Sequence, residues 1–109
     1  MEYPVQKDAH YKEAIDSMYS YNEPDYLNEI TQYISKTYTQ HYAHSKYQAT
    51  ETIIDANYGE GFCMGNILKY WKRYGKKDGK NKDDLLKIIH YAIIMLYIHD
   101  QTKGDTTNG

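Results

Sequence analysis

The sequence predicts an all-α protein, a single compact domain of four to five helices. Apolar residues recur three and four positions apart along most of the chain, and the alternation typical of strands is almost absent. A chain of 109 residues that is 40% hydrophobic suits one domain with one core. The single cysteine excludes an internal disulfide framework and fits a reducing, cytoplasmic compartment.

Two helices are predicted before residue 45. The apolar residues of the first, over about 8–19, share one helix face: Tyr11, Ala14, Ile15 and Met18. The segment from Asn22 to Asp25 is typical of a helix start, with Pro24 tolerated in the first turn. This second helix is expected to continue until the apolar period is lost at about 41–45.

Three more helices are predicted after this point. A short one stops at about 57–59, and the next begins near Gly61 and ends at Gly75. A polar segment over 76–82, with the turn signal Asp78-Gly79, precedes the last helix, which Asn81 or Asp83 can cap. A broad apolar stripe of this helix is expected to face the core: Leu85, Ile88, Ile89, Ala92 and Leu96.

Charge and tyrosine are unevenly distributed. Residues 1–60 carry four lysines and ten acids, whereas residues 61–109 carry nine basic residues and five acids. Nine of the 14 tyrosines lie within the first 47 residues, and a ring with a hydroxyl suits wet interfaces. We therefore expect an acidic, Tyr-rich helical extension (1–40) packed on a helical core with basic residues (41–101), followed by a flexible tail (102–109).

Basic residues concentrate between positions 69 and 87, which hold eight of the 13. Four lie three and four apart and predict one cationic ridge: Lys69, Lys72, Arg73 and Lys76. Convergent cations suit an anion with several charges, above all phosphate. Tyr70 lies among them and is expected on the ligand side, beside a nucleobase. A solvated basic helix face is the alternative interpretation.

Other candidate side chains carry weaker signals. Trp71 continues an apolar stripe and is expected in the core rather than against a ligand. His90 is expected to be half-buried with a partner, and Cys63 has no base partner that would make it a nucleophile. His41 and His44 share a helix face, but no further ligand follows at zinc spacing, so no metal site is predicted.

A longer pattern resembles a known family. Gly65-Asn-Ile-Leu-Lys-Tyr70 is followed by Arg73, by Lys76-Lys-Asp-Gly79, and by Asp84-Leu-Leu-Lys87 with Tyr91. His41-Tyr42 and Tyr47-Gln48 extend the likeness upstream, so it covers about 41–95. The pattern resembles a small phage-encoded family of domains of unknown function, which includes the lactococcal phage protein SaV and the domain of a podophage early nucleotide kinase.

The resemblance implies phosphate transfer to deoxynucleoside monophosphates, with ATP as donor and Mg²⁺ as a possible companion, without a Walker-type loop. By position in the pattern, Lys69 and Arg73 would grip phosphates and Asp84 would orient a cation. Asp84 and Lys87 also fit an ordinary surface ion pair. The remaining binding residues implied by the pattern are Asn66, Tyr70, Lys76, Lys77 and Lys87.

Two classes of function follow. The first is a phage nucleotide-handling protein in the bacterial host cytoplasm, either kinase-like or a nucleotide binder. The second is a non-enzymatic host-takeover or anti-defence protein, which docks on a host protein through its first helices or sequesters a nucleotide signal. General nucleic-acid binding is disfavoured by the acidic first half and a pI of 6.2. The longest apolar run, 92–98, is too short for a membrane span, and broad apolar stripes favour a homo-oligomer.

Overall fold

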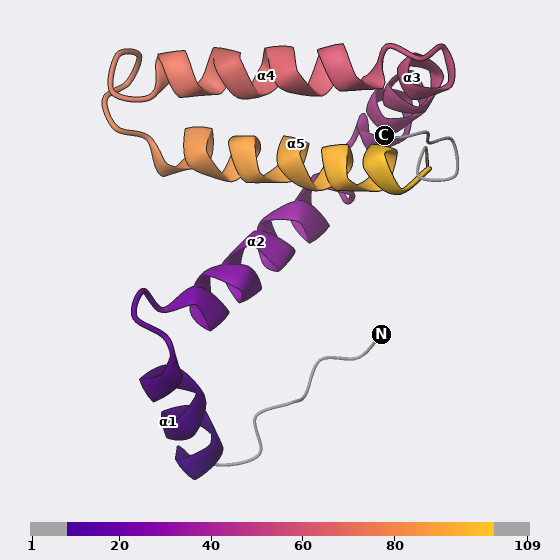
Figure 1. Cartoon of the computed structure of the whole chain (residues 1–109). Helices are drawn as coiled ribbons and strands as arrows, with labels where there is room; N and C mark the ends of the chain where they lie inside the picture. The colour runs from indigo at the N-terminus through magenta and orange to yellow at the C-terminus, as the bar shows by residue number, and fades with distance from the viewer. Residues whose placement is uncertain (1–8, 102–109) are drawn as a thin grey trace, which may run out of the picture.

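The computed structural model describes residues 9–101, which form five helices and no strand (Figure 1). In chain order these are α1 (Ala9–Met18), α2 (Glu23–Thr37), α3 (Ala43–Asp55), α4 (Gly59–Arg73) and α5 (Lys82–Gln101). The prediction of a single all-α domain is confirmed. The predicted tail over 102–109 and the side chains of Tyr11 and Ile15 lie outside the described residues.

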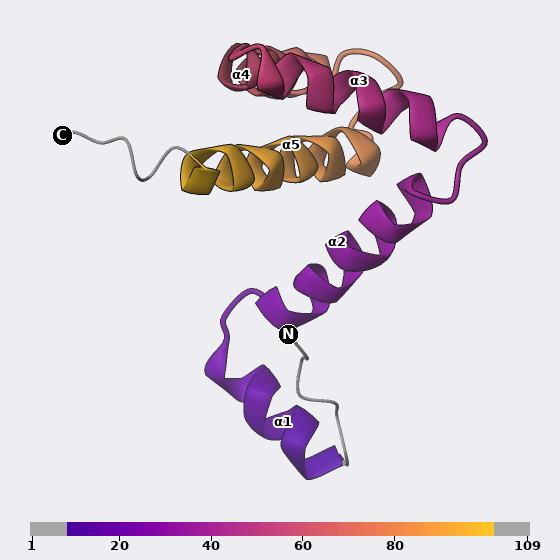
Figure 2. The same ribbon diagram turned by 90° about the vertical axis from the view of Figure 1, so that its right-hand side faces the viewer.

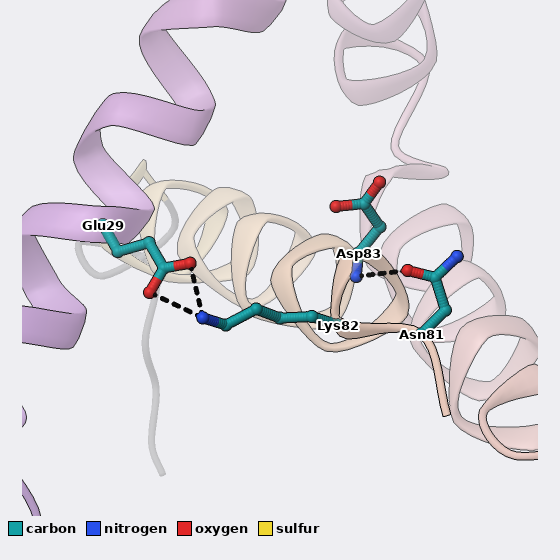
Figure 3. A network of polar contacts seen from close by, with 4 residues as sticks. All are labelled: Glu29, Asn81, Lys82 and Asp83. Carbon is teal, nitrogen blue, oxygen red and sulfur yellow. Dashed lines mark hydrogen bonds and ion pairs between the residues drawn. The ribbon is translucent and has the colours of Figure 1, made fainter. Parts of the chain in front are cut away.

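The helix ends follow the turn chemistry of the sequence, with small shifts. Asn81 caps α5, because its Oδ1 accepts a hydrogen bond from the backbone N–H of Asp83 at 2.9 Å (Figure 3). Asn22 caps α2 through its backbone carbonyl instead of its side chain, since its φ of 59° is left-handed. The second helix ends at Thr37, four residues earlier than predicted.

The link between α4 and α5 is a tight reversal. Gly75, Asp78 and Gly79 all adopt positive φ, at 83°, 62° and 71°. The Gly75 N–H donates to the Gly79 carbonyl at 2.9 Å, which closes the loop. The two helices therefore run antiparallel and side by side as a hairpin (Figure 1).

The other helices lie against this hairpin. α3 packs against α4 (Figure 2), and α2 crosses α5. An ion pair joins α2 to α5, with the Lys82 ammonium 2.8 Å from the Glu29 carboxylate (Figure 3). At the start of α4, Gly59 makes a close approach that a Cβ would block, because Ile98 and Ile54 side chains would lie 2.8 and 3.0 Å from it.

The expected core stripe is partly wrong. Trp71 is 68% exposed, and Leu85, Ile89 and Leu96 are exposed as well, whereas Ile88 is half-buried. The reason is that α4 and α5 bury other sides against each other and against α2 and α3. Among the described residues, the buried apolar side chains are Ile30, Ala43 and Cys63.

Candidate functional site

A cleft opens where four helices meet, on the side of the hairpin that faces α2 and α3. Its lining comes from one residue of α2, three of α3, one of α4 and four of α5: Tyr33, Lys46, Tyr47, Thr50, Tyr70, Lys87, His90, Tyr91 and Ile94. Among these described residues are four tyrosines and two lysines but no carboxylate. The cleft is therefore aromatic and positively charged.

Three cations surround the ring of Tyr70 at one end of the cleft. The Lys69 ammonium lies 4.7 Å from the ring centroid, the Arg73 guanidinium 5.2 Å and the Lys87 ammonium 5.7 Å. The first two come from α4 and the third from α5. Each distance is within the range of a cation–π interaction, so the ring holds together three like charges that would otherwise repel one another.

The wall contributed by α3 is fixed by a buried hydrogen bond. The Thr37 hydroxyl donates to the Ile34 carbonyl at 2.7 Å, so the Tyr47 hydroxyl must be the donor in its 2.6 Å contact with Thr37 Oγ1. The Tyr47 ring also stacks on Tyr38, with centroids 4.2 Å apart. Burial, and then the neighbouring Tyr47, raise the pKa of Tyr38.

His90 forms the floor of the cleft and is buried, which fits the prediction of a histidine with partners. Its ring lies edge-on to Tyr33 at 6.3 Å and near Tyr47 at 6.4 Å. Burial, and then the charge of Lys46, lower the pKa of His90, so this imidazole is neutral at pH 7. The positive charge of the cleft therefore comes from its lysines.

Tyr91 packs against α4, as predicted. Its ring lies between Phe62, at 5.8 Å, and Tyr70, at 6.4 Å, which sets the midpoint of α4 level with this residue of α5. Burial, and then Tyr70, raise the pKa of Tyr91. Burial also raises the pKa of the Cys63 thiol, which keeps it protonated and unreactive.

The predicted single cationic ridge is divided by the structure. Lys69 and Arg73 lie over the ring of Tyr70, which lines the cleft, although they do not line it themselves. Lys72 and Lys76 line a separate hollow together with Trp71. α4 ends at Arg73, and the extended Tyr74, with ψ of 125°, takes the chain out of the helix before Lys76. The end of the helix removes Lys76 from the predicted ridge, whereas Lys72 is still in α4 and projects toward the hollow because adjacent helical residues point in different directions.

The other predicted site residues occupy varied positions. Asn66 uses one amide hydrogen within its own helix, donating to the Phe62 carbonyl at 2.9 Å. Lys77 is exposed in the loop, where its N–H donates to the Arg73 carbonyl. Asp84 is only 3% exposed, and its Oδ2 has no hydrogen-bond partner. None of these three residues lines the cleft.

Sequence reasoning missed much of the wall that faces α4. Tyr33, Lys46 and Thr50 come from helices distant in sequence, and their only signal is position on the inner faces of α2 and α3. Tyr47 had a stronger signal, because it belongs to the upstream part of the pattern described above.

No group of three or more His, Cys, Asp or Glu side chains over 9–101 is arranged to hold a metal ion. None of the five helices combines the length and apolar character needed to cross a bilayer.

Comparison with known proteins places the chain in a family. Residues 36–93 match the family described as a protein of unknown function, DUF3310, so the chain belongs to it. The matched segment begins inside α2 and covers all of α3 and α4 and most of α5. No curated protein and no solved structure matches.

Proposed function

We propose that this member of the DUF3310 family is a phage-encoded nucleotide-handling protein that binds phosphate groups at Lys69, Arg73 and Lys87. One observation carries the proposal: the three cations lie 4.7–5.7 Å from one aromatic ring, at the end of a cleft whose lining contains no carboxylate. Such a cluster is electrostatically incomplete, and a multiply charged anion completes it.

The chemistry of the cluster fits a polyphosphate better than a single negative charge. Arg73 can bind two phosphate oxygens at once, while Lys69 and Lys87 act as point charges on neighbouring oxygens. Tyr70 organises these cations by holding them against its ring. This role differs from the expected one as a nucleobase platform.

The cleft encloses about 50 Å³, which is too small for a whole nucleoside, so in this proposal the sugar and base lie over its opening. Tyr33 and Tyr47 offer aromatic surface on which a base can stack, and the Thr50 hydroxyl can hydrogen-bond with a sugar or base. Lys46 adds a cation beside the ring of Tyr47, 5.5 Å from its centroid. His90, neutral at pH 7, leaves room for a polar contact without adding charge.

The proposed reaction is transfer of the γ-phosphoryl group of ATP, accompanied by Mg²⁺, to a deoxynucleoside monophosphate. A monophosphate oxygen forms the new bond, the bond to the β-phosphate oxygen breaks, and the products are ADP and a deoxynucleoside diphosphate. This chemistry needs charge neutralisation and alignment, which Lys69 and Arg73 supply. Asp84, one turn before Lys87, is buried and does not line the cleft, so the proposal gives it no contact with the phosphates.

The test is to incubate the full chain with ATP and each deoxynucleoside monophosphate and to measure diphosphate formation. Lys69→Ala and Arg73→Ala are expected to abolish turnover, whereas Lys80→Ala, an equal loss of charge in the exposed loop, should retain it. Calorimetric binding without turnover would support a nucleotide binder that sequesters its ligand. A chain that neither binds nor turns over nucleotides contradicts the proposal.

A second candidate function rests on the exposed arm formed by α1 and α2. Met18, Tyr21, Tyr26 and Leu27 all expose most of their surface there, within an acidic region. This composition suits docking on a host protein, as in host takeover or anti-defence. The immobilised wild-type protein should then retain a host protein, and the double variant Tyr21→Ser, Leu27→Ser should not retain it. The proposed partners in the bacterial host cytoplasm are thus a nucleotide, a host protein and a second copy of the chain.

A further inference from the structure

The hairpin carries an apolar surface on the side away from the cleft. We call it the hairpin face, and its exposed or nearly exposed residues come from both helices: Met64, Leu68 and Trp71 of α4, and Leu85, Ile89, Ile93 and Leu96 of α5. Steps of three and four residues place each set on one side of its helix. The opposite sides bear Cys63, Tyr70 and Tyr91, which pack inward or line the cleft.

The size of this face is that of one half of a stable interface. If the surface of one fully exposed residue is taken as about 200 Å², the exposed fractions of these seven residues correspond to about 700 Å² of surface. The largest apolar patch on an ordinary monomer covers roughly 300–600 Å². A second copy of the same face would bury about 1,400 Å² in total, within the range of specific protein–protein interfaces.

Charges at the two ends of the hairpin define an orientation. Glu60 lies one turn before Met64 at the open end of α4, and Lys72 lies one turn after Leu68 at the loop end. Both side chains are exposed. Two hairpins packed antiparallel therefore bring the acid of one copy to the lysine of the other, whereas parallel packing brings like charges together.

The register of such a pair follows from the midpoint of the hairpin. Tyr91 lies between Phe62 and Tyr70, so it is level with residue 66 of α4. A two-fold axis at this level sets Met64 opposite Leu68 of the second copy. The same axis sets Ile89 of α5 opposite Ile93 of the second copy, and it brings Glu60, at the edge of the stripe, to the level of Lys72 of the second copy.

We propose that two copies of this chain pack hairpin face against hairpin face, antiparallel about a two-fold axis, as a four-helix bundle. Each helix of the bundle then buries the stripe that a single copy leaves in water. The two clefts lie on the outer sides of the bundle, so the interface and the cleft can be tested separately.

Sedimentation equilibrium of the full chain tests the interface. The expected mass is about twice 12.9 kDa at micromolar concentration. Leu68→Glu should weaken the dimer on the order of 100-fold, because the buried charge occurs twice across the axis. Leu27→Glu is the matched control, since Leu27 on α2 is 64% exposed and Leu68 is 61% exposed. Helix content by circular dichroism should stay the same in both variants.

Charge exchange tests the orientation. Glu60→Lys and Lys72→Glu should each weaken the dimer several-fold, and the double variant should restore it, because every dimer holds the pair twice. A wild-type chain with the mass of one copy at 100 μM overturns the proposal, as does a dimer that Leu68→Glu leaves intact. A double variant weaker than both single variants overturns the antiparallel arrangement.

Discussion

The ring of Tyr70 offers the sharpest perturbation of the candidate site, because it contacts three cations and is itself half-buried. Tyr70→Leu removes the π face while it keeps an apolar side chain that favours helix. Tyr70→Phe keeps the face and removes only the hydroxyl. The pair of variants therefore separates the ring's electrostatic effect from its volume.

The magnitude follows from the three contacts, at 4.7, 5.2 and 5.7 Å from the ring centroid. Exposed cation–π interactions contribute about 0.5–1 kcal/mol each, and solvent screening favours the lower value. Without the ring, the cations separate, and part of the binding free energy of a polyphosphate is then used to bring them together again. We expect Tyr70→Leu to cost about 1–2 kcal/mol of binding free energy, which is roughly a 5- to 30-fold rise in Kd.

The assay is calorimetric titration of the full chain with inorganic triphosphate and with ATP at low salt. Tyr70→Phe should bind within about twofold of wild type, and thermal melts of each variant should verify that the fold is retained. The loss of near-parallel packing on Tyr91 is expected to lower the melting temperature of Tyr70→Leu slightly. Equal affinity in Tyr70→Leu and wild type would refute the reasoning, and so would a loss in Tyr70→Phe as large as in Tyr70→Leu.

Three further predictions concern the fold. Thr37→Val should lower the free energy of unfolding by about 1–2 kcal/mol, because it removes the buried acceptor of the Tyr47 hydroxyl. Thr31→Val is the control, because the Thr31 hydroxyl bonds only to its own helix at the surface. In urea titrations it should change the free energy of unfolding by less than about 0.5 kcal/mol. Gly59→Ala should destabilise the protein by about 1–3 kcal/mol, because the new Cβ would meet side chains at 2.8 and 3.0 Å. Gly65→Ala should stabilise it by up to about 1 kcal/mol, because nothing lies within 4 Å of the new Cβ. The melting temperatures of the two variants should therefore shift in opposite directions. Because burial lowers the pKa of His90, the imidazole of the unfolded chain binds a proton at a higher pH than that of the folded chain. Stability that is present above pH 6.5 should therefore decline as the pH falls toward the folded pKa. His90→Phe should flatten this dependence in urea titrations at about pH 7 and 5.5.

Local signals made the helices predictable. Apolar spacing located all five, and the residues that end or start them act locally: Gly75 through its positive φ and Asn81 through its side-chain cap. The core was harder to predict. Periodicity shows that Leu68 and Trp71 share a face, but it does not show whether that face packs against this chain.

The candidate site was predictable where its residues are close in sequence. Lys69, Tyr70 and Arg73 lie within five residues of α4, so helical geometry alone gathers them. Lys87 came from the family-like pattern, and its position beside Tyr70 depends on the hairpin. Tyr33 and Lys46 required the packing of α2 against α5 and of α3 against α4, a tertiary arrangement that no local pattern encodes.

The boundary of the family segment, at residue 36, divides the cleft unequally. Lys69, Arg73 and Lys87 lie inside the segment, whereas Tyr33 lies before it, on the part of α2 that Glu29 ties to Lys82. Among the tyrosines that line the cleft, Tyr33 lies before the family segment, whereas Tyr47, Tyr70 and Tyr91 lie within it together with the cations. In the nucleotide site that we propose, a substitution at Tyr33 is therefore expected to change the preference for the group attached to the anion, while Lys69, Arg73 and Lys87 retain the affinity for the anion itself.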